Sequence, residues 1–129
     1  MSHTARGTFE VTLTPLTSEL APPMGGFSID KTFAGDLVGT SVGQMLSAMG
    51  GVEGSAGYVA IEVVTGTLGG RKGSFVLQHS ATMDRGRPSM SITVLPDSGT
   101  DELLGLVGSL EIQIDGGEHR YVFEYSLPQ

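Results

Sequence analysis

The chain of 129 residues contains no cysteine and no tryptophan, and only 16% of its residues are charged. Without cysteine it has no disulfide framework, no thiolate zinc site and no cysteine nucleophile. Its seven basic residues are scattered among fourteen acidic ones, for a net charge of −7. Nucleic-acid affinity depends on clustered lysine and arginine, and a membrane helix needs roughly 18 apolar residues in a row. We therefore expect neither nucleic acid nor a membrane as partner.

The length and composition fit one globular domain over residues 1–129, since single domains commonly have roughly 100–150 residues. Residues 1–6 contain no regular apolar pattern, and we expect them to form a flexible tail. They also lack the basic and then apolar pattern of a secretion signal. A cytoplasmic location is the expectation that follows.

Glycine, in contrast, is abundant, with 20 residues placed singly or in pairs between β-branched runs. This spacing is typical of hairpin turns. Apolar and polar residues alternate with period two in most of the runs between the glycines, as they do in half-buried strands. The clearest alternating segments are 8–14, 27–33, 58–68, 73–83, 89–95 and the two arms around the turn at 115–118. Segment 44–49 fits either the end of a strand or a helical turn.

Seven or eight alternating strands without a long helix predict an all-β protein, either a barrel or a sandwich. A chain made almost entirely of consecutive hairpins leaves two exposed sheet edges unless the sheet closes. We therefore predict a small closed antiparallel β-barrel of about eight strands. Helix is limited to a short turn over 101–104, with Thr100 as its N-cap.

Three ionisable residues fall on apolar strand faces. Lys31 shares a face with Phe27 and Phe33 by the alternation of its segment. In the hairpin over 58–83, a four-residue turn at 69–72 places Glu62 directly opposite His79. A turn of odd length would separate that pair.

A charge in a dry interior needs a partner or a function, because burying it alone costs several kcal/mol. The structural interpretation is that Lys31, Glu62 and His79 neutralise one another. The functional interpretation is that they face a ligand, with Glu62 exchanging a proton, His79 assisting it and Lys31 binding a carboxylate or enolate. The predicted ligand-lining residues are Phe27, Phe33, Tyr58, Phe75, Leu77, Met90, Tyr121 and Phe123. We expect no metal or other cofactor, because only Glu62 and His79 converge where three or four ligands are needed.

Several segments together resemble a bacterial family of unknown function whose lipocalin-like barrel is similar to that of allene oxide cyclase. They are KTFAGDL at 31–37, TGTLGGRKGSF at 65–75 with His79, and PDSGT at 96–100. The resemblance extends from about residue 6 to residue 127. It implies an eight-stranded antiparallel barrel and homo-oligomers. It transfers no catalytic residue, because no pattern here matches the plant cyclase site.

Three functions are compatible with this sequence. The first is an isomerase- or cyclase-like barrel that holds a small apolar molecule and uses Glu62, His79 and Lys31. The second is a non-catalytic carrier of a hydrophobic metabolite. The third is a structural protein whose interior is filled by its aromatic side chains. A cavity beside Glu62 separates the first two from the third, because an eight-stranded barrel is either filled or holds one small ligand.

Overall fold

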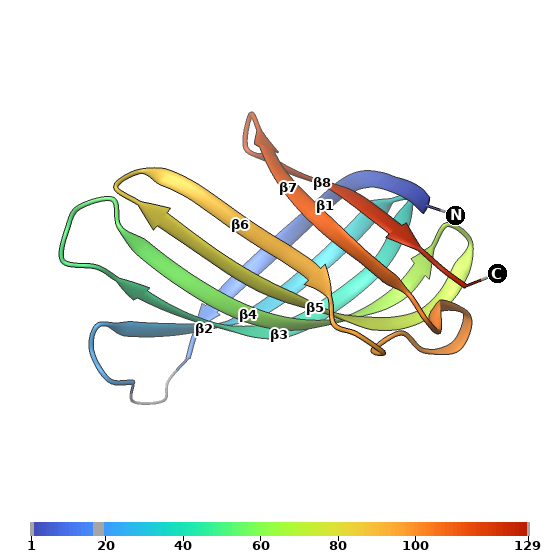
Figure 1. The fold of residues 1–129 in the computed structure, drawn as a ribbon, viewed down its shortest axis with the longest axis horizontal. Coiled ribbons are helices and arrows are strands. Elements are labelled where there is room, and N and C mark those ends of the chain that lie inside the picture. Colours follow the sequence, from blue (N-terminus) through green and yellow to red (C-terminus); the bar gives the residue numbers. More distant parts are fainter. Residues whose placement is uncertain (1, 17–19, 129) are drawn as a thin grey trace.

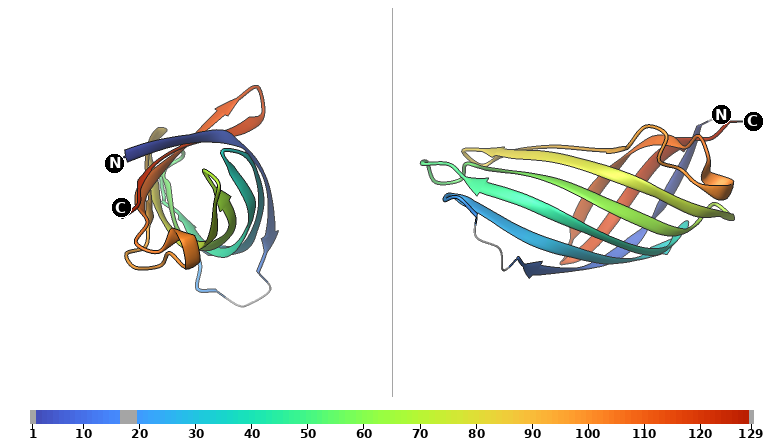
Figure 2. Two further views of the ribbon diagram at one scale, coloured as in Figure 1. Left: turned by 90° about the vertical axis from the view of Figure 1, so that its right-hand side faces the viewer. Right: turned by 90° about the horizontal axis from the view of Figure 1, so that it is seen from below.

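The computed structural model describes residues 2–16 and 20–128, which form a closed barrel of eight antiparallel strands (Figure 1). Each strand pairs with the next one in sequence, and β8 closes the ring against β1, as the end-on view in Figure 2 shows. The strands are β1 (Ser2–Pro15), β2 (Met24–Gly35), β3 (Leu37–Met49), β4 (Ala56–Leu68), β5 (Arg71–Asp84), β6 (Arg87–Val94), β7 (Val107–Asp115) and β8 (Glu118–Ser126). A single 3-10 turn, η1 (Asp101–Leu103), is the helical element of the described residues. The predicted all-β barrel with one short helical turn is confirmed.

Glycine pairs form the tight turns at two hairpins. Gly69 and Gly70 have φ angles of 56° and 84°, and Gly116 and Gly117 have 59° and 84°. A two-residue turn that follows the twist of its strands needs positive φ at both central positions, which glycine adopts without strain. The β7–β8 turn consequently pairs Ile112 with Tyr121 and Leu110 with Phe123.

The turn between β4 and β5 changes the predicted register. It contains two residues rather than four, so Glu62 lies opposite Leu77 and His79 lies opposite Ala60. The expected direct pairing of Glu62 with His79 was therefore wrong by two positions. A shift by an even number leaves every side chain on its original face. Glu62 and His79 consequently both point into the barrel as diagonal neighbours.

The N-terminal segment also differs from its prediction. Residues 2–6 are not a flexible tail: they begin β1 and pair with β8, with Ser2 opposite Ser126. The buried Ala5 side chain belongs to the hydrophobic core. Closing a barrel requires a partner for β8, and the start of the chain supplies it. At the other uncertain segment, β3 continues to Met49 and pairs with β4, so 44–49 is a strand.

One half of the barrel interior is filled by side chains. Phe75 and Phe123 stack with ring centroids 5.7 Å apart, and Leu103 of η1 covers them at this end of the barrel. The Tyr121 hydroxyl accepts a hydrogen bond from the Leu37 amide at 2.9 Å and donates one to the Ala34 carbonyl near the end of β2, also at 2.9 Å. Both ends of the chain lie at this end of the barrel (Figure 2). None of the described residues forms a helix long and apolar enough to cross a membrane.

Candidate functional site

The other half of the barrel contains an open cavity of about 480 Å³. It lies at the end of the barrel that carries the connections from β1 to β2, β3 to β4, β5 to β6 and β7 to β8. Its walls are apolar and include Ile29, Met45, Ala60 and Ile112. The volume lies within the roughly 300–1,000 Å³ typical of small-molecule sites. The filled-barrel alternative therefore describes only the packed half.

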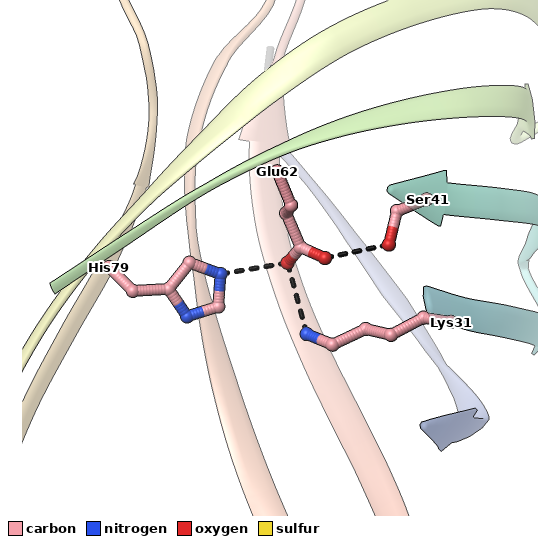
Figure 3. Close-up of polar contacts among 4 residues, drawn as sticks. All are labelled: Lys31, Ser41, Glu62 and His79. Atoms are coloured by element: carbon pink, nitrogen blue, oxygen red, sulfur yellow. Dashed lines mark hydrogen bonds and ion pairs between the residues drawn. The ribbon is translucent and has the colours of Figure 1, made fainter. Parts of the chain in front are cut away.

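Two polar side chains that line the cavity, Lys31 and His79, lie where it meets the packed half. Both contact the carboxylate of Glu62 (Figure 3). Glu62 lies behind them, with no exposed surface. Its Oε1 accepts a hydrogen bond from Lys31 Nζ at 3.0 Å and lies 2.7 Å from His79 Nε2, while Oε2 accepts one from Ser41 Oγ at 2.7 Å. The three predicted residues are thus brought together, and Ser41 is a fourth member. We call these four residues the Glu62 cluster.

Strand register explains how the Glu62 cluster assembles. Lys31 on β2 lies opposite Ser41 on β3, and Glu62 on β4 lies opposite Gly43 on β3. A side chain at position 43 would place its Cβ 2.7 Å from the Cα and Cβ of Glu62 and against the Ile61 carbonyl. The glycine therefore allows β3 and β4 to approach closely enough for Ser41 and Lys31 to reach the carboxylate.

The Glu62 carboxylate is ionised at neutral pH. Burial alone raises its pKa, but the hydrogen bond from His79, the charge of Lys31 and the hydrogen bond from Ser41 outweigh burial. Together they lower the pKa from 4.5 to about 2. A carboxylate only accepts hydrogen bonds, so His79 Nε2 carries the proton that points at Glu62. Glu62 therefore acts as an anchor for two donors.

Lys31 is held from a second direction by aromatic rings. Its Nζ lies 4.9 Å from the ring centroid of Phe9 and 6.0 Å from that of Phe33. An ammonium over a ring face is attracted by the negative charge of the π system. The contacts of Lys31 with Glu62 and with Phe9 hold its ammonium at the inner end of the cavity, which we call the floor. The N–H groups of Lys31 that do not contact Glu62 are donors available at this floor.

Tyr58 adds a further donor in the cavity wall. Burial raises the pKa of its hydroxyl, and the negative charge of Glu62 raises this pKa further. The hydroxyl therefore stays protonated across the physiological range. Tyr58 and Met90 are the two predicted lining residues that do line the cavity.

The other predicted lining residues lie outside the cavity. Phe27 is partly buried on β2 but is not among the residues that line the cavity. The remaining residues point inward in the packed half and form its core: Phe33, Phe75, Leu77, Tyr121 and Phe123. Alternation along a strand tells which side chains point inward, but it does not tell how far along the barrel axis each one lies.

The sequence reasoning missed Ser41 and His119 as site residues. His119 lines the cavity, and its ring centroid lies 5.2 Å from that of Phe9. The signal for His119 was present in the alternation of β8, since Tyr121 and Phe123 point inward and His119 shares their parity. Ser41 carried no such signal, because a small polar residue is common on either face of a strand. The described residues contain no group of three or more side chains suited to a metal.

The fold and the site together define a small closed β-barrel protein with one packed half and one open apolar half. The chain belongs to the DUF3224 family of proteins of unknown function, whose family model matches residues 5–125. It is similar to the crystal structure of a DUF3224 protein of unknown function from Shewanella oneidensis MR-1, with 44% sequence identity and a TM-score of 0.95. The similarity covers 100% of this chain and 99% of the other. No curated protein matches this chain.

Proposed function

We propose that the protein binds a small, mostly apolar molecule in the open half of the barrel, with a polar end of that molecule at Lys31 and His79. The observation that carries this proposal is an apolar cavity of about 480 Å³ with an anchored pair of hydrogen-bonding groups at its floor. Sites for small molecules combine apolar walls with a few convergent polar groups in this way. An interior that served only stability would be filled, as it is in the packed half.

The charges of the Glu62 cluster favour an uncharged polar end. The positive charge of Lys31 is balanced by the ionised Glu62 at 3.0 Å. The donors of Lys31 are therefore already balanced by an anion. A ligand carboxylate would be buried there without a compensating cation, which is costly, whereas a carbonyl needs only a donor. The proposal therefore commits to a carbonyl compound with an apolar chain.

The wall between β6 and β7 supports access for such a chain. The one residue pair that joins these two strands is Thr93 with Ser109. Figure 1 shows β6 and β7 separating from each other toward the β5–β6 and β7–β8 turns. Met90 and Ile114 line the cavity from either side of the gap in pairing and are 50% and 69% exposed. Covering apolar side chains at the mouth would stabilise a bound ligand by roughly 25 cal/mol for each Å² removed from water.

Binding can be tested by displacement of the neutral dye Nile red with 2-decanone, decanoate and decane, three probes with similar chains. We expect 2-decanone to bind at least about tenfold more tightly than decanoate, because only the latter buries an unpaired charge. Ala60→Phe should weaken binding of 2-decanone by roughly 30-fold or more, since the added ring occupies a cavity of this size. Ala34→Phe is the matched control, because Ala34 is exposed on the outside of β2.

Equal displacement by 2-decanone with either variant would contradict binding in the cavity. Tighter binding of decanoate than of 2-decanone would contradict the choice of a carbonyl compound but would still support binding in the cavity. Native mass spectrometry of freshly purified protein would add the mass of any molecule that the protein retains from its host.

A second candidate function, an isomerase, is favoured by the orientation of His79. Nε2 is committed to Glu62, and Nδ1 makes no hydrogen bond to a described residue (Figure 3). Every fully buried side-chain nitrogen of the described residues has a hydrogen-bond partner. Nδ1 has none, so it is not fully buried, and because His79 lines the cavity, Nδ1 is open to the ligand. An imidazole whose Nε2–H points at a carboxylate presents Nδ1 as the nitrogen that can act as a general base.

In this candidate reaction, His79 Nδ1 takes a proton from the carbon next to a ligand carbonyl. The C–H electron pair moves into the enolate, and Lys31 donates a hydrogen bond to the enolate oxygen. Where the ligand has a C=C bond next to that carbon, the enolate is a dienolate, and return of the proton from Nδ1 to its far carbon moves the double bond, so no oxidant or reductant is needed. Glu62 is a positioning residue in this scheme, because a group with a pKa of about 2 is a weak base.

Exchange of the α-hydrogens of 2-decanone in D2O, followed by NMR, tests the isomerase candidate. We expect the protein to accelerate exchange and His79→Gln to reduce that acceleration by about 100-fold, within the usual range for loss of a general base. His119→Gln is the matched control, since it removes the other cavity histidine. Binding without any acceleration would identify a non-catalytic carrier instead.

A further inference from the structure

Methionine is concentrated in the open half of the barrel. The described residues include five methionines: Met24, Met45, Met49, Met83 and Met90. Met45, Met83 and Met90 line the cavity, while Met24 begins β2 and Met49 ends β3 on the same side of the barrel. The hydrophobic core that fills the other half contains no methionine among the described residues. The open half therefore carries a side-chain chemistry that the packed half lacks.

The thioether of methionine is the group of this protein that peroxides attack most readily. Peroxides oxidise cysteine thiolates and methionine thioethers. The chain contains no cysteine, so no thiol competes for the oxidant.

Two of the cavity methionines are open to solvent. Met90 is 50% exposed and Met83 is 40% exposed, whereas Met45 is more buried. Met90 also lies beside the gap in pairing between β6 and β7. A small peroxide can therefore reach the sulfur atoms of Met83 and Met90 from the mouth of the cavity.

Oxidation of these two residues changes the wall of the cavity from apolar to polar, because a sulfoxide is a polar group. Met83 lies directly opposite Ala56 on β4 and Pro88 on β6. Met90 lies directly opposite Ala81 on β5. None of these three opposing side chains carries a hydrogen-bond donor, so a sulfoxide oxygen here takes its hydrogen bonds from water at the open mouth. An apolar chain packed against it removes that water, which is costly without a replacement hydrogen bond.

We propose that Met83 and Met90 form a peroxide-sensitive switch that releases the bound molecule. The inference rests on the proposed function, because a ligand must occupy the cavity before it can be released. In the oxidation step, the thioether sulfur bonds to one oxygen of hydrogen peroxide, the O–O bond breaks, and the second oxygen leaves as water. The sulfur is oxidised to a sulfoxide and the peroxide is reduced. Methionine sulfoxide is reduced again by dedicated enzymes, so the switch is reversible.

Treatment with hydrogen peroxide, followed by its removal and by binding of 2-decanone, tests the switch, and peptide mass spectrometry identifies the oxidised residues. We expect oxidation of Met83 and Met90 to weaken binding by roughly tenfold or more in the natural chain. The double variant Met83→Leu with Met90→Leu should bind before treatment and lose less than about threefold afterwards, since leucine conserves the volume and has no sulfur. The double variant Met24→Leu with Met49→Leu is the matched control. It removes two methionines that do not line the cavity, so it should stay as sensitive as the natural chain.

A reciprocal measurement uses the ligand as a shield. Saturating 2-decanone should slow oxidation of Met83 and Met90 but not of Met49, which is 67% exposed outside the cavity. Oxidation of Met83 and Met90 without loss of binding, an equal loss in M83L/M90L, or unfolding of the treated chain by circular dichroism would overturn the switch while leaving the proposed function intact. An untreated natural chain that does not bind 2-decanone would overturn both.

Discussion

Replacing Glu62 with leucine is expected to lower the free energy of unfolding by about 3–5 kcal/mol. The carboxylate accepts hydrogen bonds from three side chains and has no exposed surface. Its removal leaves the Lys31 ammonium buried without an anion, and leaves Ser41 and His79 without an acceptor. An uncompensated buried charge costs more than the pair contributed, because the ammonium loses its water on folding and gains nothing in exchange.

Adding Lys31→Met to Glu62→Leu should recover most of this loss. The double variant removes both charges and fills their place with apolar atoms, which is often neutral or stabilising. Urea denaturation of the natural chain, both single variants and the double variant yields the coupling free energy directly. Glu111→Leu is the matched control, since Glu111 is exposed on β7 and its loss should change stability by less than about 0.5 kcal/mol. Additive losses in the double variant would refute a functional ion pair at this site.

The protein should lose about 3 kcal/mol of stability through Glu62 alone as the pH falls from 4.5 to 2. The folded state lowers the pKa of this carboxyl from 4.5 to about 2, because three donors and the charge of Lys31 favour the ionised form. A group with a lowered folded pKa stabilises the protein fully above its unfolded pKa. That stabilisation disappears as the pH drops toward the folded pKa, where the folded state must also take up the proton.

Urea denaturation at a series of pH values between 6 and 2 measures this effect. Glu62→Gln cannot titrate, so its stability should vary with pH by about 3 kcal/mol less than that of the natural chain. Glu111→Gln should follow the natural chain, because it removes an exposed carboxyl of the same type. If the free energy of unfolding varied with pH in the same way for Glu62→Gln and for the natural chain, Glu62 would have an ordinary pKa in the folded protein.

The fold was predictable because period-two alternation and glycine pairs are local signals. A strand with one dry and one wet face must alternate, and a two-residue hairpin must have residues that tolerate positive φ. The same alternation placed Lys31, Glu62 and His79 on inward faces correctly. Even the error of two positions in the β4–β5 register left these orientations unchanged, because strand parity has a period of two.

The composition of the site was less predictable. Distinguishing Phe75, which fills the packed half, from Met90, which lines the open half, requires the height of each residue along the barrel axis. That height depends on how all eight strands are staggered around the ring, and stagger is a property of the closed barrel. The contact of Ser41 with Glu62 has the same origin, since it joins residues 21 positions apart through β3 and β4.

The order of residues alone determined that this chain is an all-β barrel with three ionisable groups inside it, because burial imposes a pattern on every strand. Only the tertiary structure decided that the interior is divided into a filled and an open half, and that Glu62 lies behind Lys31 and His79 instead of lining the cavity itself. The physical reason is that parity acts within one strand, whereas packing and cavity position arise where strands distant in sequence meet.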